Sequence, residues 1–596
     1  MHKLNLSIIR RTLRQVRPYF DSEEKGQARW LFFFLIVLLI GDTVSSVLFN
    51  QQSGELTSAL ADKDGPRFWH AIAEFFGILV VSVPIYAYYY YVRDMLALNW
   101  RRWLTNRFLD RYFRDRGYYH LLSKPEIDNP DQRITDDVYS FTSQTVMFLL
   151  VFANATLQLF AFGKVLWSIS VLLVLMLIVY AFIVTGLTFG IFGEKLVFLL
   201  WNQRRREADF RFSLVRMREN AEPVALYHGE KQEQSHLQQV YAKLYSNGNA
   251  VIRWTLRLNF VYYSNNFLTL ALPTLIIAPR VLSGELEVGK IVVATGAFTA
   301  ILSTLTLLLD NMESLSRFTA SVGRLETLAS SLSPQGILEP PKSVKAKRRK
   351  FRLGKQKEDP AVEVPKLAIT RIATRESDQL GFENLTLKTP NYERTLVKEL
   401  TVSVSPGQGL MIVGASGLGK SSLLRAMAGL WTSGEGTLLR PKDDEMLFLP
   451  QQAYMAIGSL RVQLNYPDLD RHAPDEELLE VLNKVNLAGL AERCGGFDAD
   501  FDFEVLSFGE RQRLAFARVL LKKPRYVLLD ESTSALDRDN EAALYETLLS
   551  TSAALISVSH RPPLVRYHTQ VLELKPEGAW ELHSAEQFEF TDELAY

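Results

Sequence analysis

The apolar residues of this chain are concentrated in its first half, in runs long enough to cross a lipid bilayer. A hydrocarbon core of about 30 Å needs roughly 20 apolar residues in a helix. We predict six membrane-spanning helices, two of them in the longest run and joined there by a tight turn near Lys164. The charge-poor runs are Trp30–Phe49, Phe68–Val92, Phe141–Phe192, Leu258–Ala278 and Ile291–Leu309.

Two long polar connections, between spans two and three and between spans four and five, are rich in arginine. Basic connections favour the cytoplasmic side of a membrane, so both connections and both chain ends are expected there. Apolar residues recur at helical spacing in each connection, which predicts helical extensions of the spans. The arginines include Arg101, Arg102, Arg107 and Arg111 in the first connection and Arg204, Arg205, Arg206 and Arg211 in the second.

The segment Leu4–Phe20 precedes the first span and is amphipathic. It predicts a helix lying on the membrane surface, with an ordinary soluble helix as the alternative. Its basic residues, such as Arg10 and Arg17, are spread along the segment, so we expect no secretory signal peptide.

Three ionisable residues, Asp42, Glu74 and Lys164, fall within or near spans. Such groups are costly in a membrane and often line a water-filled path for substrate or protons. The alternatives are structural: Lys164 at an interfacial turn and Glu74 near a helix end.

A basic segment follows the spans. Nine basic residues and no acidic residue lie between Lys342 and Lys357. This composition predicts a flexible connector, and contact with anionic lipid head groups is the alternative.

The second half opens with a phosphate-binding pattern. A strand-like run, Gly409–Val413, leads into Gly414–Ser421, which has the form G-x-x-x-x-G-K-S and precedes a helix-forming run. Backbone N–H groups of such a loop bind phosphate oxygens, the lysine reaches the β- and γ-phosphates, and the hydroxyl ligates Mg²⁺. The candidate ATP-binding residues here are Gly414, Ser416, Gly417, Gly419, Lys420, Ser421 and Ser422, with Ser421 also a Mg²⁺ ligand.

Two adjacent carboxylates end a later apolar strand, Tyr526–Glu531. Asp530 suits a partner for Mg²⁺. Glu531 suits a catalytic base that polarises the attacking water.

The string Leu506–Arg513 resembles the LSGGQ signature of ABC transporters, with Phe508 and Glu510 as departures. This resemblance covers Leu380 to about His583 and implies an α/β P-loop ABC ATPase that binds ATP and Mg²⁺. It assigns Gln451 to the Q-loop as a catalytic residue and Mg²⁺ ligand, and His560 to the catalytic switch. It places Ser507, Gly509 and Glu510 at the nucleotide, together with Asp537, the last residue of the D-loop Ser534–Asp537. Tyr392 is the nearest candidate to stack on adenine.

The expected organisation is a membrane α-helical, exporter-type domain (1–332), a basic linker (333–366) and an ABC nucleotide-binding domain (367–596). Six spans with one ATPase make half of a transporter. The signature of one ATPase completes the nucleotide site of another in this family, so we expect a homodimer.

Several loops resemble the SbmA/BacA-like group, which is related to the subfamily D transporters of peroxisomes. They are Asn99–Thr105, Asp128–Ile134, Glu207–Arg211, Arg218–Glu222 and Ala225–Glu230. The resemblance implies an ATP-driven transporter of the bacterial inner membrane that moves peptides, bleomycin or cobalamin-like cargo inward. Three alternatives stay open: fatty acid or acyl-CoA transport, a transporter driven by a proton gradient, and an ATP-gated channel.

Composition conceals these two halves. The mean hydropathy is +0.01 and the net charge +1, averages of an apolar half and a polar half. The balanced charge argues against a surface built for nucleic acid. The spans and the half-transporter organisation make membrane lipid, cargo and a second copy of the chain the expected partners. The single cysteine, Cys494, excludes an internal disulfide and multi-cysteine metal sites.

Overall fold

The computed structural model describes residues 6–122, 127–310, 312–332, 370–468, 470–471 and 473–590. The chain divides into two compact units, Met1–Lys350 and Phe351–Tyr596. We call them the helical unit and the C-terminal unit. The expected basic linker lies outside the described residues, so its character and the three domain boundaries stay predictions.

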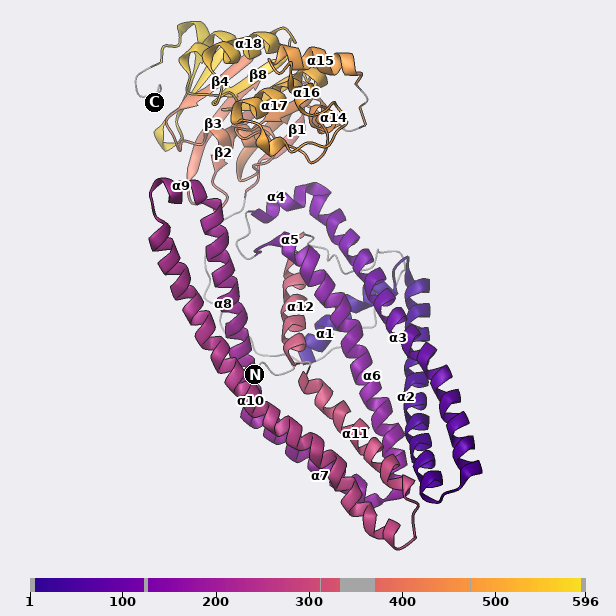
Figure 1. The fold of residues 1–596 in the computed structure, drawn as a ribbon. Coiled ribbons are helices and arrows are strands. Elements are labelled where there is room, and N and C mark those ends of the chain that lie inside the picture. Colours follow the sequence, from indigo (N-terminus) through magenta and orange to yellow (C-terminus); the bar gives the residue numbers. More distant parts are fainter. Residues whose placement is uncertain are drawn as a thin grey trace, which may run out of the picture. The chain divides into compact units, whose positions relative to one another are not determined.

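Long helices build the helical unit, with the short helices α4 (Gly117–Leu122), α5 (Pro130–Gln132) and α9 (Ala221–Leu226) between them. Figure 1 shows α8 and α10 running side by side as a separate arm, which we call the α8–α10 arm. The long helices are α1 (Leu6–Phe20), α2 (Lys25–Ala61), α3 (Gly65–Phe113), α6 (Val138–Ile169), α7 (Val171–Thr188), α8 (Glu194–Glu219), α10 (Glu230–Leu282), α11 (Gly289–Asp310) and α12 (Met312–Leu332).

The predicted spans correspond to these helices. Within the part of the chain that the structure describes, five helical stretches are long and apolar enough to cross a membrane. The sixth expected span lies in α11, whose apolar stretch Gly289–Thr304 is shorter. The predicted helical extensions are present too, because α3 continues to Phe113 and α8 to Glu219.

The position of the tight turn was predicted wrongly. Lys164 is helical and exposed within α6, and the chain turns at Ser170, which has an extended backbone. A lysine can extend its ammonium group to water from within a helix, so its charge need not mark a turn.

The first helix, α1, packs on other helices of its own unit. The Tyr19 ring is fully buried and stacks on Trp100 of α3, with 5.6 Å between ring centroids. Gln15, also buried, donates to the Val322 carbonyl of α12 at 3.3 Å. One face of this amphipathic helix is therefore covered by protein.

The C-terminal unit holds two sheets. The larger has the order β10-β9-β4-β8-β7-β6, in which β10 (Trp580–Ser584) is antiparallel to β9 (Gln570–Leu574) and the other neighbours are parallel. The smaller has the order β1-β5-β2-β3. The remaining strands are β1 (Ala373–Glu376), β2 (Leu380–Lys388), β3 (Thr395–Val404), β4 (Gly409–Gly414), β5 (Gly434–Arg440), β6 (Met446–Leu449), β7 (Tyr526–Asp530) and β8 (Ala554–Val558).

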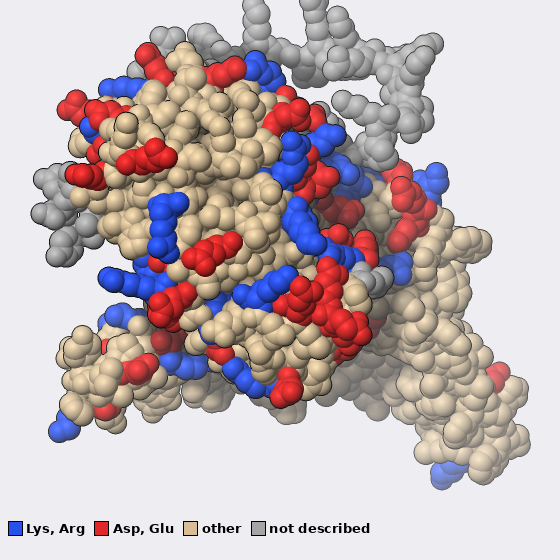
Figure 2. All heavy atoms as spheres, turned by 90° about the horizontal axis from the view of Figure 1, so that it is seen from above, with Lys and Arg blue, Asp and Glu red and all other residues tan. Residues whose placement is uncertain are grey.

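Helices α13 (Lys420–Met427), α17 (Phe508–Lys522) and α18 (Arg538–Leu549) accompany the larger sheet, and α14 (Leu460–Asn465), α15 (Asp475–Lys484) and α16 (Leu490–Arg493) form a helical part that packs on α17. Every residue of β4, β7 and β8 is buried, as expected for parallel strands covered on both faces. The carboxyl ends of these strands meet at one sheet edge, where open α/β sheets bind their ligands. On the face of this unit in Figure 2, Lys and Arg are interspersed with Asp and Glu.

Candidate nucleotide site and membrane cavity

The loop after β4 has the backbone of a phosphate-binding loop. Gly414, Gly417 and Gly419 have φ angles of +141°, +82° and +99°. These values favour glycine, because a side chain is strained there. At Gly419 space is short as well, since an added Cβ would lie 3.1 Å from the Leu396 Cβ. The loop then enters α13, whose first turn carries Lys420, Ser421 and Ser422.

Lys420 is buried and closes over this loop. Its Nζ donates to the carbonyl oxygens of Gly414 at 2.7 Å and Ala415 at 2.9 Å. Burial lowers the pKa of this ammonium group, and the nearby carboxylates of Glu531 and Asp530 act in the opposite direction. Phosphate oxygens are stronger acceptors for a cation than the loop carbonyls, so the lysine is placed to exchange partners. The Ser416 side chain is exposed on the same loop.

Oxygen atoms suited to a magnesium ion meet beside the loop. The Ser421 hydroxyl donates to the Asp530 Oδ1 at 2.8 Å, and Asp530 is buried at the end of β7. Gln451 follows β6, the neighbouring strand, and adds an amide. Hydroxyl, carboxylate and amide oxygens are the ligand types that Mg²⁺ prefers, so these residues fit the ion.

The three candidate catalytic residues lie together at the same sheet edge. The Gln451 Nε2 donates to one oxygen of Glu531 at 3.2 Å, and the His560 Nε2 lies 3.5 Å from the other. The His560 Nδ1 is buried and has no hydrogen-bond partner among the described residues. Glu531 is thus held between two polar side chains, and its carboxylate is near enough to Lys420 to act on the pKa of that ammonium group.

The signature residues form the first turn of α17. Ser507 is the N-cap of this helix, and Gly509 and Glu510 follow it. An added Cβ at Gly509 would lie 3.3 Å from the Ala535 carbonyl, which places this turn against the D-loop. Asp537, at the end of the D-loop, caps α18 by accepting from the Asn540 N–H at 2.8 Å.

Two residues that the sequence reasoning passed over connect these motifs. Gln512 is buried, donates to the Gln451 carbonyl at 3.2 Å and accepts from the Ala535 N–H at 3.1 Å. Arg561 donates to the D-loop carbonyls of Leu536 at 3.1 Å and Ser534 at 3.0 Å. Gln512 stands within the string Leu506–Arg513 and Arg561 directly after His560, but no side-chain pattern indicates that their partners are backbone groups of other loops.

Tyr392 lies in the turn between β2 and β3 with a φ of +60°. Its hydroxyl donates to the Thr370 carbonyl and its ring is half-buried. Whether this ring stacks on adenine stays a prediction.

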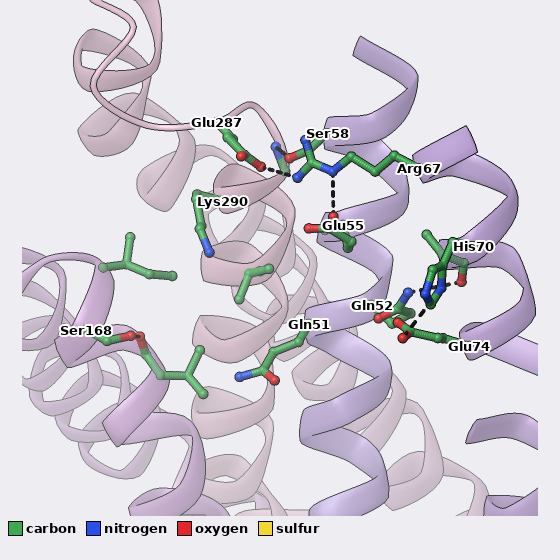
Figure 3. A pocket seen from close by; sticks show the side chains of 16 residues that line it. Gln51, Gln52, Glu55, Ser58, Arg67, His70, Glu74, Ser168, Glu287 and Lys290 are labelled. Carbon is green, nitrogen blue, oxygen red and sulfur yellow. Dashed lines mark hydrogen bonds and ion pairs between the residues drawn. The ribbon is translucent and has the colours of Figure 1, made fainter. Parts of the chain in front are cut away.

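The helical unit contains a cavity of about 610 Å³, which we call the membrane cavity. Figure 3 shows Arg67 of α3 reaching Glu55 of α2 and Glu287 of the turn before α11. The Arg67 guanidinium lies 2.6 Å from Glu55, 3.1 Å from Asp62 and 2.9 Å from Glu287. The polar residues that line the membrane cavity are Gln51, Gln52, Glu55, Ser58, Arg67, His70, Glu74, Ser168, Glu287 and Lys290.

The three ionisable residues singled out in the spans therefore have different surroundings. Glu74 lines the membrane cavity, where the His70 Nδ1 lies 3.6 Å from its carboxylate. Asp42 is buried in α2, and its Oδ1 finds no hydrogen-bond partner in the described part of the chain. Lys164 is exposed on α6.

Comparison with known proteins decides the family. Residues 16–282 match the model described as ABC transporter transmembrane region 2, and residues 397–534 match the ABC transporter model. An uncharacterized ABC transporter ATP-binding protein of Synechocystis sp. is 41% identical over 95% of this chain and 83% of its own length. The chain belongs to the ABC transporter family.

Two further relatives narrow the assignment of this ABC transporter. The chloroplastic ABC transporter D family member 2 of Arabidopsis thaliana is 36% identical over 94% of this chain and 85% of its own length. The lysosomal cobalamin transporter of Homo sapiens is 29% identical over 97% of both chains. The protein is an ATP-driven, multi-pass half-transporter of subfamily D type, with an ATP-binding ABC ATPase domain coupled to transport.

Proposed function

We propose that this half-transporter works as a homodimer in the bacterial inner membrane, with its ATPase domain in the cytoplasm, and imports a bulky hydrophilic compound. We further propose that it belongs with the SbmA/BacA-like group. Its domains are then 1–332 and 367–596, joined by the basic linker.

The α8–α10 arm supports a dimer. Leu226 and Tyr227, at the tip of the arm and outside the apolar spans, are 73% and 86% exposed in the single chain. Large apolar groups clustered in water favour burial by a partner. A half-transporter needs a partner in any case, and a second copy is the simplest one.

Each nucleotide site would bind one ATP with residues from both copies. The loop Gly414–Ser422 of one copy would hold the phosphates, and the signature turn of the other, with Ser507, Gly509 and Glu510, would close over them. Mg²⁺, held by Ser421, Asp530 and Gln451, would neutralise charge that develops on the phosphate oxygens. Asp537 would hold the D-loop in shape between the two copies.

Glu531 is the proposed catalytic base, and its position between Gln451 and His560 is the observation that carries this assignment. The carboxylate would accept a proton from the attacking water, while His560 and Gln451 hold the carboxylate in its orientation. A positioned base contributes typically 10²–10⁴-fold to a rate.

The test is Glu531→Gln in the reconstituted full-length protein. We expect steady-state ATP hydrolysis to fall by about 100-fold or more, with ATP still bound, because the amide keeps the shape but cannot take the proton. Glu546→Gln, at an exposed position of α18, is the matched control and should hydrolyse normally. Retained hydrolysis in Glu531→Gln would refute the assignment.

The membrane cavity supports a hydrophilic cargo, because its lining is rich in amide, hydroxyl and charged groups. An acyl chain would leave these groups without partners, at a cost for each one. The cobalamin transporter among the relatives is consistent with this cargo class.

Transport by proteoliposomes would test the cargo against cobalamin, bleomycin, a proline-rich peptide and an acyl-CoA. We expect ATP-dependent movement of one hydrophilic compound without a pH gradient. Movement of the acyl-CoA alone would contradict the cargo class. Movement that needs a pH gradient and no ATP would favour a proton-driven transporter, in which the buried Asp42 becomes the first residue to examine.

A further inference from the structure

Glu510 departs from the glutamine of the family signature and binds the signature serine. One of its oxygens, Oε2, accepts from both the Ser507 N–H and the Ser507 hydroxyl at 2.9 Å. The Glu510 N–H donates back to the Ser507 hydroxyl oxygen at 3.3 Å. This reciprocal arrangement is a capping box, which fixes the first turn of α17.

Arg493 holds the other oxygen of the same carboxylate. Its Nη1 lies 2.5 Å from the Glu510 Oε1, and it comes from α16, a helix in a different part of the fold. The Glu510 side chain is 17% exposed and that of Arg493 52%. Although burial of Glu510 acts in the opposite direction, Arg493 and Ser507 hold its pKa below the ordinary value, so the carboxylate is ionised at neutral pH.

An ionised carboxylate beside Ser507 opposes the task proposed for this serine. In the dimer the Ser507 hydroxyl would bind the terminal phosphate of ATP, which is anionic. Two like charges near one hydroxyl disfavour each other. A glutamine at this position would bring no charge, so the glutamate needs compensation that the usual signature does not.

We propose that Arg493 is a positioning residue for ATP: its guanidinium neutralises the charge of Glu510, so that the Ser507 hydroxyl can exchange this carboxylate for the terminal phosphate. The inference rests on the proposed dimeric site. It assigns to the helical part of the ATPase a role in nucleotide affinity that the signature string does not contain.

Steady-state ATP hydrolysis by the reconstituted full-length protein tests this role. Arg493→Met should raise the KM for ATP about tenfold and change kcat less, because the loss acts on phosphate binding. Glu510→Gln removes the charge that Arg493 neutralises and provides the second background in which the loss of Arg493 is measured. In the double variant Arg493→Met with Glu510→Gln, the KM should return to the value of Glu510→Gln, since no charge is left to neutralise.

A purely structural ion pair predicts another outcome. If Arg493 only joins α16 to α17, its loss should act equally with glutamate or glutamine at 510, and this result would overturn the proposal. An unchanged KM in Arg493→Met would do the same. Arg525→Met is the matched control, because Arg525 and Glu445 form a 2.8 Å pair of similar exposure in the same domain.

Two further variants keep the outcomes distinct. Arg493→Lys retains the positive charge and should restore most of the affinity, which gives a reading if the methionine variant does not fold. Ser507→Ala reports on the dimeric site itself. Loss of affinity in Ser507→Ala with no effect in any Arg493 variant refutes the role of Arg493 alone, and an active, unaffected Ser507→Ala refutes the proposed site.

Discussion

The nucleotide site and the membrane cavity are both polar, but they are assembled in different ways. The nucleotide site takes its side chains from loops that directly follow β4, β6, β7 and β8. The membrane cavity is lined by side chains from helices that are distant in the sequence. Arg67 links two of them, because its guanidinium contacts both Glu55 and Glu287. Short segments of the chain fix the groups of the nucleotide site, whereas those of the cavity are joined by exposed ion pairs, which contribute only about 0–1 kcal/mol each.

Next to the ion pairs of the membrane cavity, helices α2 and α11 are closely packed. The Ser58 hydroxyl accepts from the Gly289 N–H at 3.0 Å, and the Asn50 amide donates to the Val293 carbonyl at 2.9 Å. An added Cβ at Gly289 would lie 1.9 Å from the Gly54 carbonyl oxygen. Helices α2 and α11 therefore approach at backbone distance, a form of packing that small residues permit in membranes.

The largest effect is expected from a substitution in the nucleotide site that leaves the helical unit unchanged. Lys420→Ala should weaken ATP binding by about 100-fold or more, because charged groups that clamp phosphates contribute on this order. The measurement is nucleotide binding by the purified protein, with Lys484→Ala, an exposed lysine paired with Glu480, as control. Unchanged binding would contradict the role of Lys420, and the helical unit should keep its thermal stability.

The second largest effect is expected from low pH, which should lower the stability of the ATPase domain. His568 is buried between the Leu564 carbonyl and the Ser557 hydroxyl, each 2.8 Å away, and burial lowers its pKa from 6.5 to about 4. The unfolded chain takes up the proton first, so the stabilisation is complete above pH 6.5 and is lost as the pH falls from 6.5 to 4. The loss amounts to at most about 3 kcal/mol.

Calorimetry of the full chain across this pH range measures that effect. His568→Gln should be less stable at pH 7 but should lose less stability between pH 6.5 and 4. An equal loss in both proteins would show that another group is responsible.

The smallest effect should fall on the helical unit. Gly289→Ala should lower its stability by about 1–3 kcal/mol, because the added methyl group meets the Gly54 backbone, and overpacking typically costs this much. ATP binding should be unchanged. Gly323→Ala is the control, since an added Cβ there meets nothing within 4 Å. A neutral Gly289→Ala, seen by thermal unfolding in detergent, would show that α2 and α11 are not tightly packed.

Much of the nucleotide site could be predicted from sequence because each motif is local. The glycines of Gly414–Ser421 set a loop conformation by themselves, and a buried strand delivers Asp530 and Glu531 to a sheet edge. Gln512 and Arg561 were missed because their partners are carbonyls and N–H groups of other loops, which no side-chain pattern reveals. The pair of Arg493 with Glu510 joins two helices and was hidden for the same reason.

The sequence by itself determined an apolar helical half, a phosphate-binding half and the family of both, because hydrophobic length and short motifs are properties of the local chain. Only the tertiary structure decided that the third and fourth spans part at Ser170, that α1 is covered by α3 and α12, and that Arg67 joins three carboxylates. Apolar composition fixes how much chain can enter a bilayer. Which side chains meet across helices depends on packing between segments that are distant in the sequence.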